Sequence, residues 1–473
     1  MRISDLTYVS PERTAKGISL RLPLLVVVLS ALLFSGCNKP AESTTTETGA
    51  ETATSKLSDE ELLTLVQQQT FQYFWDGAEP TSGAARERYH VDGEYPQNDQ
   101  HVVTTGATGF GVMAILVGIE RGFITREEGF QRLQQITNFL EKADRFHGAW
   151  PHWLQGETGK VKPFSPKDDG GDLVETAFLV QGLLTVRQYF TDGNEQEKAL
   201  AAQINKLWEE VEWDWYRNGG QNALYWHWSP NQGWAMNFAI RGYDECLITY
   251  VLAASSPTHG VPAEVYHEGW ARNGDIKSDA TKYGHEVVLN HNGHKGSVGP
   301  MFWAHYSYLG LDPRGLTDKY ADYWKLNRNH TLIQRDYCVD NPKGFKGYGE
   351  NAWGLTASYS PKGYSGHSPE NDLGVITPTA VLSSYPYAPE ESMKVIRHLY
   401  EDLGDKVIGK YGPYDAYSET DNWFPQRYLG IDQGPIVVMI ENGRSGLLWD
   451  LFMSAPEVQA GLNKLGFESP QLK

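Results

Sequence analysis

The stretch GATGFGVMAILVGIERGFITREEGFQRLQQITNFLEKA, residues 106–143, predicts two consecutive helices joined by a short turn. Its first half is apolar on every side and rich in Gly and Ala, whereas its second half mixes charged and apolar residues. Thr125 followed by Glu128 is a capping box, which marks the start of the second helix. A helix without a polar face is buried, and an amphipathic helix covers it. The stretch therefore predicts an inner helix paired with an outer one.

The same pairing recurs along the chain, and a further capping box, Ser58 with Glu61, opens the folded part. The other segments with helical periodicity are residues 57–75, 171–190, 195–213, 243–255, 296–308, 316–330, 376–387, 388–404, 434–453 and 456–466. This pattern of about six pairs predicts an all-α fold, an (α/α)6 toroid with an inner and an outer ring of helices. The rival fold, a repeat solenoid, requires a fixed sequence period, which the chain lacks.

The N-terminal residues predict export and anchoring. Residues 1–37 place basic residues ahead of an apolar stretch and end in Ser-Gly-Cys, which resembles a bacterial lipobox with Cys37 as the lipid-modified residue. An ordinary signal peptide with an incidental Cys37 is the alternative. Residues 38–56 form a polar tether with too few apolar side chains to fold, so the folded domain spans 57–473. We expect a bacterial cell-envelope protein, lipid-anchored on the periplasmic side or the outer surface.

Composition argues against several partners and cofactors. The formal net charge of −18 disfavours nucleic acid, which requires a basic surface, and it disfavours polyanionic polysaccharides. Cys246 and Cys338 form no C-x-x-C pair, and His291 with His294 alone does not support a metal site. The sequence contains neither a phosphate-binding glycine loop nor the G-x-S-x-G elbow of hydrolases. We therefore expect neither a metal nor a cofactor.

Acidic residues gather where the inner helices are predicted to begin. Asp172 and Glu175 have the spacing of a helix cap and its capping-box partner, and such a pair is often purely structural. The same arrangement recurs, however, at Asp244 and Glu245, and again at Asp432, which precedes a first-turn proline. Because the inner helices of a toroid begin around one end of the ring, we expect these carboxylates to converge on one cavity.

Convergent carboxylates in a half-buried cavity are suited to cleaving glycosidic bonds. One carboxyl group must be protonated to supply a proton to the leaving oxygen, and another must be ionised to activate water or attack carbon. Crowding of like charges separates two such pKa values. Aromatic clusters fit the same chemistry, because ring faces contact the C–H faces of sugars. These clusters occupy residues 147–155, 225–234, 348–355 and 414–428, although loop packing alone could also account for any single ring.

Four stretches together resemble one known family. They are residues 104–124, 168–184, 237–259 and 429–452, which read TTGATGFGVMAILVGIERGFI, DDGGDLVETAFLVQGLL, NFAIRGYDECLITYVLAASSPTH and LGIDQGPIVVMIENGRSGLLWDLF. In this order they are similar to the glycoamylase-like family, and most similar to glycoside hydrolase family 144, the endo-β-1,2-glucanases. The resemblance runs over essentially the whole folded part. It implies an (α/α)6 fold and hydrolysis of β-1,2-glucan with inversion.

The resemblance also implies the site residues. Three acids required in that family fall on Asp172, Glu175 and Glu245, and Asp432 corresponds to a base position. We expect Glu245 to be the general acid and Asp432 the general base, with Asp172 and Glu175 holding substrate hydroxyls or water. Substrate contacts are expected from side chains in the aromatic loops and just before Glu245: Arg241, Tyr243, Trp226, His227, Trp353 and Trp423. The expected partner is β-1,2-glucan or its oligosaccharides, bound by a monomer.

Other functions stay open at this stage. The family includes domains that act on β-1,2-glucosides by transglycosylation, and exo action is an alternative to endo action. A polysaccharide lyase also uses α-helical toroids but would generate an unsaturated, ultraviolet-absorbing product. A non-catalytic glycan-binding lipoprotein would keep the aromatic residues without needing the acids.

The lipobox-like sequence yields a direct test. We expect Cys37→Ser to release the protein from the membrane fraction, because the variant lacks the thiol that receives the lipid. Fractionation of cells, followed by mass spectrometry of the N-terminus, measures this. A variant that stays with the membranes, beside a wild type that carries no lipid, would refute the anchor.

Overall fold

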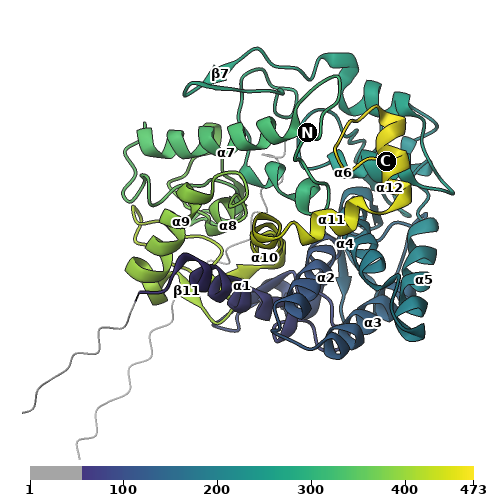
Figure 1. The fold of residues 1–473 in the computed structure, drawn as a ribbon, viewed down its shortest axis with the longest axis horizontal. Helices are drawn as coiled ribbons and strands as arrows, with labels where there is room; N and C mark the ends of the chain where they lie inside the picture. Colours follow the sequence, from purple (N-terminus) through teal and green to yellow (C-terminus); the bar gives the residue numbers. More distant parts are fainter. Residues whose placement is uncertain (1–55) are drawn as a thin grey trace, which may run out of the picture.

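The computed structural model describes residues 56–473, with the side chains of residues 97 and 98 excepted, so Cys37 and the predicted tether lie outside the described residues. Helices dominate this part of the chain (Figure 1). They are α1 (Asp59–Trp75), α2 (Thr105–Glu120), α3 (Arg126–Lys142), α4 (Leu173–Phe190), α5 (Glu195–Glu209), α6 (Leu247–Ser255), α7 (Tyr323–Asp340), α8 (Pro378–Leu382), α9 (Pro389–Arg397), α10 (Gly430–Arg444), α11 (Leu447–Met453) and α12 (Pro456–Leu465).

The helices form two concentric rings, which confirms the predicted (α/α)6 toroid. The inner ring runs α2, α4, α6, a pair of 3₁₀ turns, α8 and α10, and α10 packs against α2 to close it. The 3₁₀ turns are η6 (Met301–Ala304) and η7 (Tyr306–Leu309). Around this ring lie α3, α5, α12, α7, α9 and α1. Figure 1 shows the C-terminal helices in yellow, with α12 beside α6.

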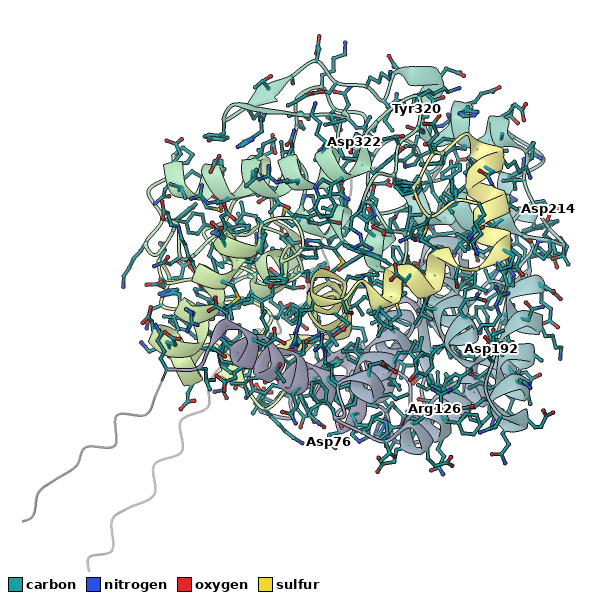
Figure 2. All side chains as sticks on the ribbon, in the orientation of Figure 1. Asp76, Arg126, Asp192, Asp214, Tyr320 and Asp322 are labelled. Atoms are coloured by element: carbon teal, nitrogen blue, oxygen red, sulfur yellow. The ribbon has the colours of Figure 1, made fainter. Side chains whose placement is uncertain are left out.

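The inner ring is apolar because its helices are enclosed on all sides. Nearly every residue of α2 and of α4 is buried, whereas α3 and α5 bury one face only. Glycines permit the closest approach: a Cβ on Gly182 would lie 2.1 Å from the carbonyl oxygen of Gly109 across the α2–α4 contact. Both predicted capping boxes, at the starts of α1 and α3, are present. On the periphery, Asp76, Arg126 and Asp192 project outward (Figure 2).

The prediction that consecutive helices pair is wrong at two positions of the ring. The outer partner of α6 is the C-terminal helix α12, and α1 takes the outer place beside α10. This exchange closes the ring, because α1 covers the last inner helix and α12 covers α6. Residues 296–308 form short 3₁₀ turns rather than a helix, because Pro300 and Gly310 bracket them. The predicted helix 434–453 is divided at Gly446, whose φ of 78° is left-handed.

Short strands tie the loops together. They are β1 (Arg88–His90), β2 (Val102–Thr104), β3 (Trp153–Gln155), β4 (Val161–Lys162), β5 (Gly171–Asp172), β6 (His227–Trp228), β7 (Thr281–Lys282), β8 (His285–Glu286), β9 (Ala357–Ser358), β10 (Ser365–Gly366), β11 (Ile408–Gly409), β12 (Gly412–Pro413) and β13 (Arg427–Leu429). Three of them, β2, β5 and β13, end directly before the inner helices α2, α4 and α10. Each of these strands pairs with an antiparallel partner: β2 with β3, β5 with β6 and β13 with β1. The pairing therefore fixes the backbone at the start of each of these helices.

Within residues 56–473, no helix combines the length and the apolar character needed to cross a bilayer.

Candidate active site

Asp172 is the N-cap of α4, as the sequence predicted. Its Oδ1 accepts hydrogen bonds from the backbone N–H groups of Val174 at 3.0 Å and Glu175 at 2.9 Å. Its own N–H donates to the carbonyl of Trp150, so Glu175 does not complete a capping box. The other carboxylate oxygen of Asp172 is left to face the site. The cap and the site thus use different oxygens of one buried side chain.

Glu175 joins the first turns of two inner helices. Its Oε2 accepts hydrogen bonds from the N–H of Gly106 at 2.7 Å and from the hydroxyl of Thr104 at 3.1 Å, at the start of α2. A Cβ on Gly106 would lie 2.6 Å from this same oxygen, so only glycine leaves room for it. Burial raises the pKa of Glu175 above its usual value and the Asp172 charge adds to this, while His152 opposes it. Glu175 is therefore held in place by α2.

Two histidines contact the acids at the start of α4. The Nδ1 of His152 lies 3.0 Å from Asp172 Oδ2, and its Nε2 lies 4.0 Å from Glu175 Oε1. The Nε2 of His227 lies 3.4 Å from Asp168 Oδ2 and 3.5 Å from Asp172 Oδ2. The register of the antiparallel β5–β6 pair places His227 opposite Asp172, next to these acids. His227 was predicted as a substrate contact, and the structure places it in this cluster.

The cluster has a defined charge state. Burial alone would lower the pKa of His152, but Glu175, Asp172 and Asp168 outweigh it and raise the pKa to about 10. Burial would raise the pKa of Asp172, but hydrogen bonds from His152 and His227 hold it well below the usual range. At neutral pH, His152 therefore carries a proton and Asp172 is an anion.

Glu245 lies in the turn that leads into α6, two residues before the helix begins, and not inside the helix as the sequence suggested. Its neighbour Asp244 accepts a hydrogen bond from the N–H of Cys246 at 2.9 Å. The Glu245 Oε2 is buried and has no hydrogen-bond partner among the described residues. The hydroxyl of Ser307 in η7 donates to the Glu245 carbonyl and accepts from the N–H of Ile248, which fixes the turn.

Burial and like charges keep Glu245 protonated. Burial raises its pKa well above the usual value, and the charges of Asp244, Glu175 and Asp172 raise it further. Burial also raises the pKa of Asp244, to about 7, although the N–H of Cys246 opposes this. A buried carboxyl group with a free oxygen and a raised pKa is suited to act as a general acid.

Asp432 lies in the first turn of α10, whereas the sequence had placed it just before the helix. Pro435 accordingly sits at the sixth residue of α10 and not in its first turn. Both carboxyl oxygens of Asp432 are buried and accept no N–H or hydroxyl hydrogen bond from the residues that the structure describes. Burial, then the charge and hydrogen bond of Asp415, raise the pKa of Asp432 well above its usual value.

Tyr306 is a buried residue of η7. Its ring packs against Phe110 and Phe178, with ring centroids 5.1 Å and 5.5 Å away. Burial raises the pKa of its hydroxyl well above the usual value, and the charges of Asp432, Glu245 and Glu175 add to the effect. Acids from α4, from the turn before α6 and from α10 therefore all act on this one hydroxyl.

The predicted substrate contacts separate into three groups. Trp226 is half-buried and stacks on His227 at 5.6 Å and 11°, next to the acids. Trp423 is half-buried in a turn closed by its N–H and the carbonyl of Ser418, and Arg241 is exposed and donates to the carbonyl of Glu268.

Two of the predicted contacts lie in the hydrophobic core. The side chains of Tyr243 and Trp353 are fully buried there. Tyr243 donates its hydroxyl proton to Asn327 at 3.2 Å. Both residues lie next to polar stretches of the sequence. The presence of aromatic residues in such a stretch does not show which rings are buried in the core and which are exposed.

Sequence reasoning missed His152 and Asp415 as site residues. Both lie inside stretches already singled out for their aromatic residues, 147–155 and 414–428. His152 directly precedes β3, and the pairing of β3 with β2 places His152 at the site. Asp415 follows β12. A search of those loops for titratable residues would have found them, but their partners come from distant segments.

Two groups of side chains have the ligand spacing of a cation site, with ligand atoms within 4.8 Å of one another: His152 with Asp168 and Asp172, and Asp244 with Glu245 and Cys246.

Known proteins match most of this chain. The Glycoamylase family model, described as "Putative glucoamylase", matches residues 237–456. An endo-β-1,2-glucanase structure from Chitinophaga pinensis, in complex with sophorotriose and glucose, is 68% identical with a TM-score of 0.87, covering 88% of this chain and 100% of that one. A β-1,2-glucanase structure from Parabacteroides distasonis is 46% identical with a TM-score of 0.82, covering 87% of this chain and 60% of that one.

A curated relative is also similar. It is an exo β-1,2-glucooligosaccharide sophorohydrolase (non-reducing end) from Parabacteroides distasonis, 47% identical over 441 residues. The match covers 90% of this chain but 60% of the relative, so the chain spans about three fifths of that protein's length.

The charge state of His152 predicts a pH-dependent contribution to stability. Its folded pKa of about 10 exceeds the ordinary value of 6.5, so the protonated ring stabilises the fold fully below about pH 6.5. This contribution is lost as the pH rises toward 10. Urea unfolding at both ends of that range should show a larger loss of unfolding free energy in wild type than in His152→Gln. His259→Gln, at an exposed site, should lose as much unfolding free energy over this pH range as wild type. Equal losses in wild type and His152→Gln would contradict the charge state assigned to His152.

Proposed function

Because the chain belongs to the glycoamylase-like family, alongside the β-1,2-glucanases of glycoside hydrolase family 144, we propose that it hydrolyses β-1,2-glucan. The observation that carries the proposal is the buried carboxyl group of Glu245, whose Oε2 has no hydrogen-bond partner among residues 56–473 and whose pKa is raised well above the usual value by burial. The similarity to β-1,2-glucan-degrading enzymes supports the linkage of the substrate.

Glu245 acts as the general acid in this proposal. Its free Oε2 donates a proton to the glycosidic oxygen as the bond to the anomeric carbon breaks, because a sugar alkoxide is a poor leaving group. Low local polarity and the charges of Asp244 and Glu175 keep this proton in place until substrate arrives. Asp432 accepts the proton from the attacking water on the opposite face of the sugar, which inverts the anomeric centre.

Asp172 and Glu175 take positioning roles. Asp172 is fully buried, its Oδ1 is occupied by the cap of α4, and its Oδ2 is engaged with His152 and His227. It therefore orients the two imidazoles. Glu175 holds the start of α2 against α4 and adds to the field that keeps Glu245 protonated.

We propose endo action, with exo action as the second candidate. The endo-β-1,2-glucanase from Chitinophaga pinensis supports the first, since the similarity extends over that whole chain. The exo-acting relative from Parabacteroides distasonis favours the second. We further propose that the protein works at the bacterial cell envelope as a monomer anchored through Cys37, where it would meet exported or external glucan.

Product analysis tests the proposal. Residues from 57 onward, incubated with linear β-1,2-glucan, should release a ladder of oligosaccharides from the earliest times. Proton NMR should show the α anomer first, since a β-linkage is cleaved with inversion. Release of one disaccharide alone would establish exo action, an initial β anomer would contradict inversion, and an unchanged polymer would refute the function.

Glu245→Gln tests the general acid. The amide fits the same space but cannot donate a proton, and general acid catalysis is worth on the order of 10²–10⁴-fold. We expect hydrolysis to slow at least about 100-fold, with a melting temperature near that of wild type.

The matched control is Glu195→Gln, which makes the same substitution in the exposed first turn of α5. A charge at a helix end is worth only about 0.3–1 kcal/mol, so this variant should keep wild-type turnover. A folded Glu245→Gln that retains more than about a tenth of the wild-type rate would remove Glu245 from the mechanism.

A further inference from the structure

The β9–β10 hairpin presents an exposed aromatic ring that the mechanism above does not use. Its two strands pair in antiparallel register, Ser358 opposite Ser365. Two backbone hydrogen bonds between Ser360 and Gly363 close the turn, and the Ser360 hydroxyl also donates to the Gly363 carbonyl at 2.7 Å. Tyr364 directly follows this turn, and its side chain is 40% exposed. The turn is therefore well fixed, and it leaves the ring of Tyr364 open to solvent.

Hydrogen bonds attach this hairpin to the helix that carries Asp432. The Ser358 hydroxyl in β9 lies 2.7 Å from the hydroxyl of Thr377, the N-cap of α8. The hydroxyl of Thr379, inside α8, donates to the backbone carbonyl of Asp432 at 2.7 Å. Helix α8 also packs against α10 (Figure 1). The hairpin is thus fixed, through α8, against the first turn of α10.

Tyr359 lies on the β9 side of the turn and is held from three directions. Its N–H donates to Asp415 Oδ2 at 2.8 Å, its hydroxyl lies 3.2 Å from His90 Nε2, and the guanidinium of Arg427 lies over its ring at 5.6 Å. The Tyr364 ring meets this ring perpendicularly, with centroids 6.4 Å apart and an interplanar angle of 85°. A perpendicular neighbour orients the Tyr364 ring but covers at most one of its faces.

The surroundings of Tyr364 differ from those of a ring that simply projects into solvent. Burial raises the pKa of the Tyr364 hydroxyl well above its usual value, and the charges of Asp432, Asp415 and Glu87 add to the effect. Tyr283, in the turn between β7 and β8, is similarly exposed, at 43%, but its hydroxyl donates to the exposed Asp340 at 3.4 Å. An exposed ring whose hydroxyl is enclosed by protein lines a concave surface.

We propose that Tyr364 is a substrate-binding residue whose ring stacks on one glucosyl unit of the chain that is held beside Asp432. The inference rests on the proposed function for the identity of the sugar. A glucosyl ring presents a face of C–H groups, and an aromatic side chain contacts such a face over a large area. Tyrosine does so at a small cost in conformational entropy, because it has only two side-chain torsions.

The hairpin prepares this contact before the sugar arrives. Its strands are paired, its turn is closed by backbone hydrogen bonds, and the neighbouring Tyr359 is fixed by three partners. Ordering a loop on binding costs free energy, and a prearranged ring avoids that cost. Because the ring contacts the sugar and not the reacting atoms, it contributes equally to the ground state and to the transition state. Its loss therefore raises KM and leaves kcat close to its original value.

Steady-state kinetics on linear β-1,2-glucan test the proposal. Tyr364→Ala should raise KM about 10-fold, which corresponds to about 1.4 kcal/mol of lost binding free energy, with kcat close to wild type. Tyr364→Phe keeps the ring and should keep the wild-type KM. The matched control is Tyr283→Ala, the same substitution at a comparably exposed tyrosine of another hairpin turn, which should leave both constants unchanged. An unchanged KM in Tyr364→Ala, or a KM in Tyr364→Phe as high as in Tyr364→Ala, would overturn the stacking contact.

Hydroxyl-radical footprinting reads the contact with the tyrosine in place, so it decides the matter even if Tyr364→Ala does not fold. Oxidation of Tyr364 in Glu245→Gln is measured by mass spectrometry, with and without linear β-1,2-glucooligosaccharides at saturating concentration. We expect the sugar to protect Tyr364 and to leave the oxidation of Tyr283 unchanged. Equal oxidation of Tyr364 with and without sugar would overturn the proposal. If wild type leaves β-1,2-glucan intact, the proposed function fails, whereas protection of Tyr364 would still establish that its ring binds the sugar.

Discussion

The structure depends on burying several carboxyl groups at the loop-bearing end of the inner ring. Each acid is ionised or neutral according to the donors around it. Asp172 accepts two N–H bonds at the start of α4 and contacts two histidines, so its charge is stabilised. Glu245 has an oxygen with no donor in residues 56–473 and neighbours of like charge, so it keeps its proton. The contrast between these two acids is what the proposed chemistry requires.

The toroid creates this contrast through its backbone. Short strands end where α2, α4 and α10 begin, and their pairing partners are loops that carry His152, His227 and the β1 region. The helix starts are thereby fixed, and the acids on them cannot move apart to relieve repulsion.

Much of this could be predicted from the sequence, because the deciding signals are local. The apolar Gly-rich helices, the capping boxes and the acids before the inner helices gave the double ring and the residues Asp172, Glu175, Glu245 and Asp432. The exchange of α12 and α1 could not be predicted, since it follows from closing the ring. Asp415 could not be predicted either, because burial of its carboxyl group against the N–H of Tyr359 depends on tertiary packing. Burial of Tyr243 likewise depends on tertiary packing.

The central claim is that Glu245 protonates the oxygen of the scissile bond. The most direct test is a crystal structure of Glu245→Gln bound to a β-1,2-linked glucooligosaccharide. The account predicts that a glycosidic oxygen lies within about 2.6–3.2 Å of the side-chain amide of residue 245, with a water between the sugar and Asp432. A bound oligosaccharide with every glycosidic oxygen out of reach of residue 245 would contradict it.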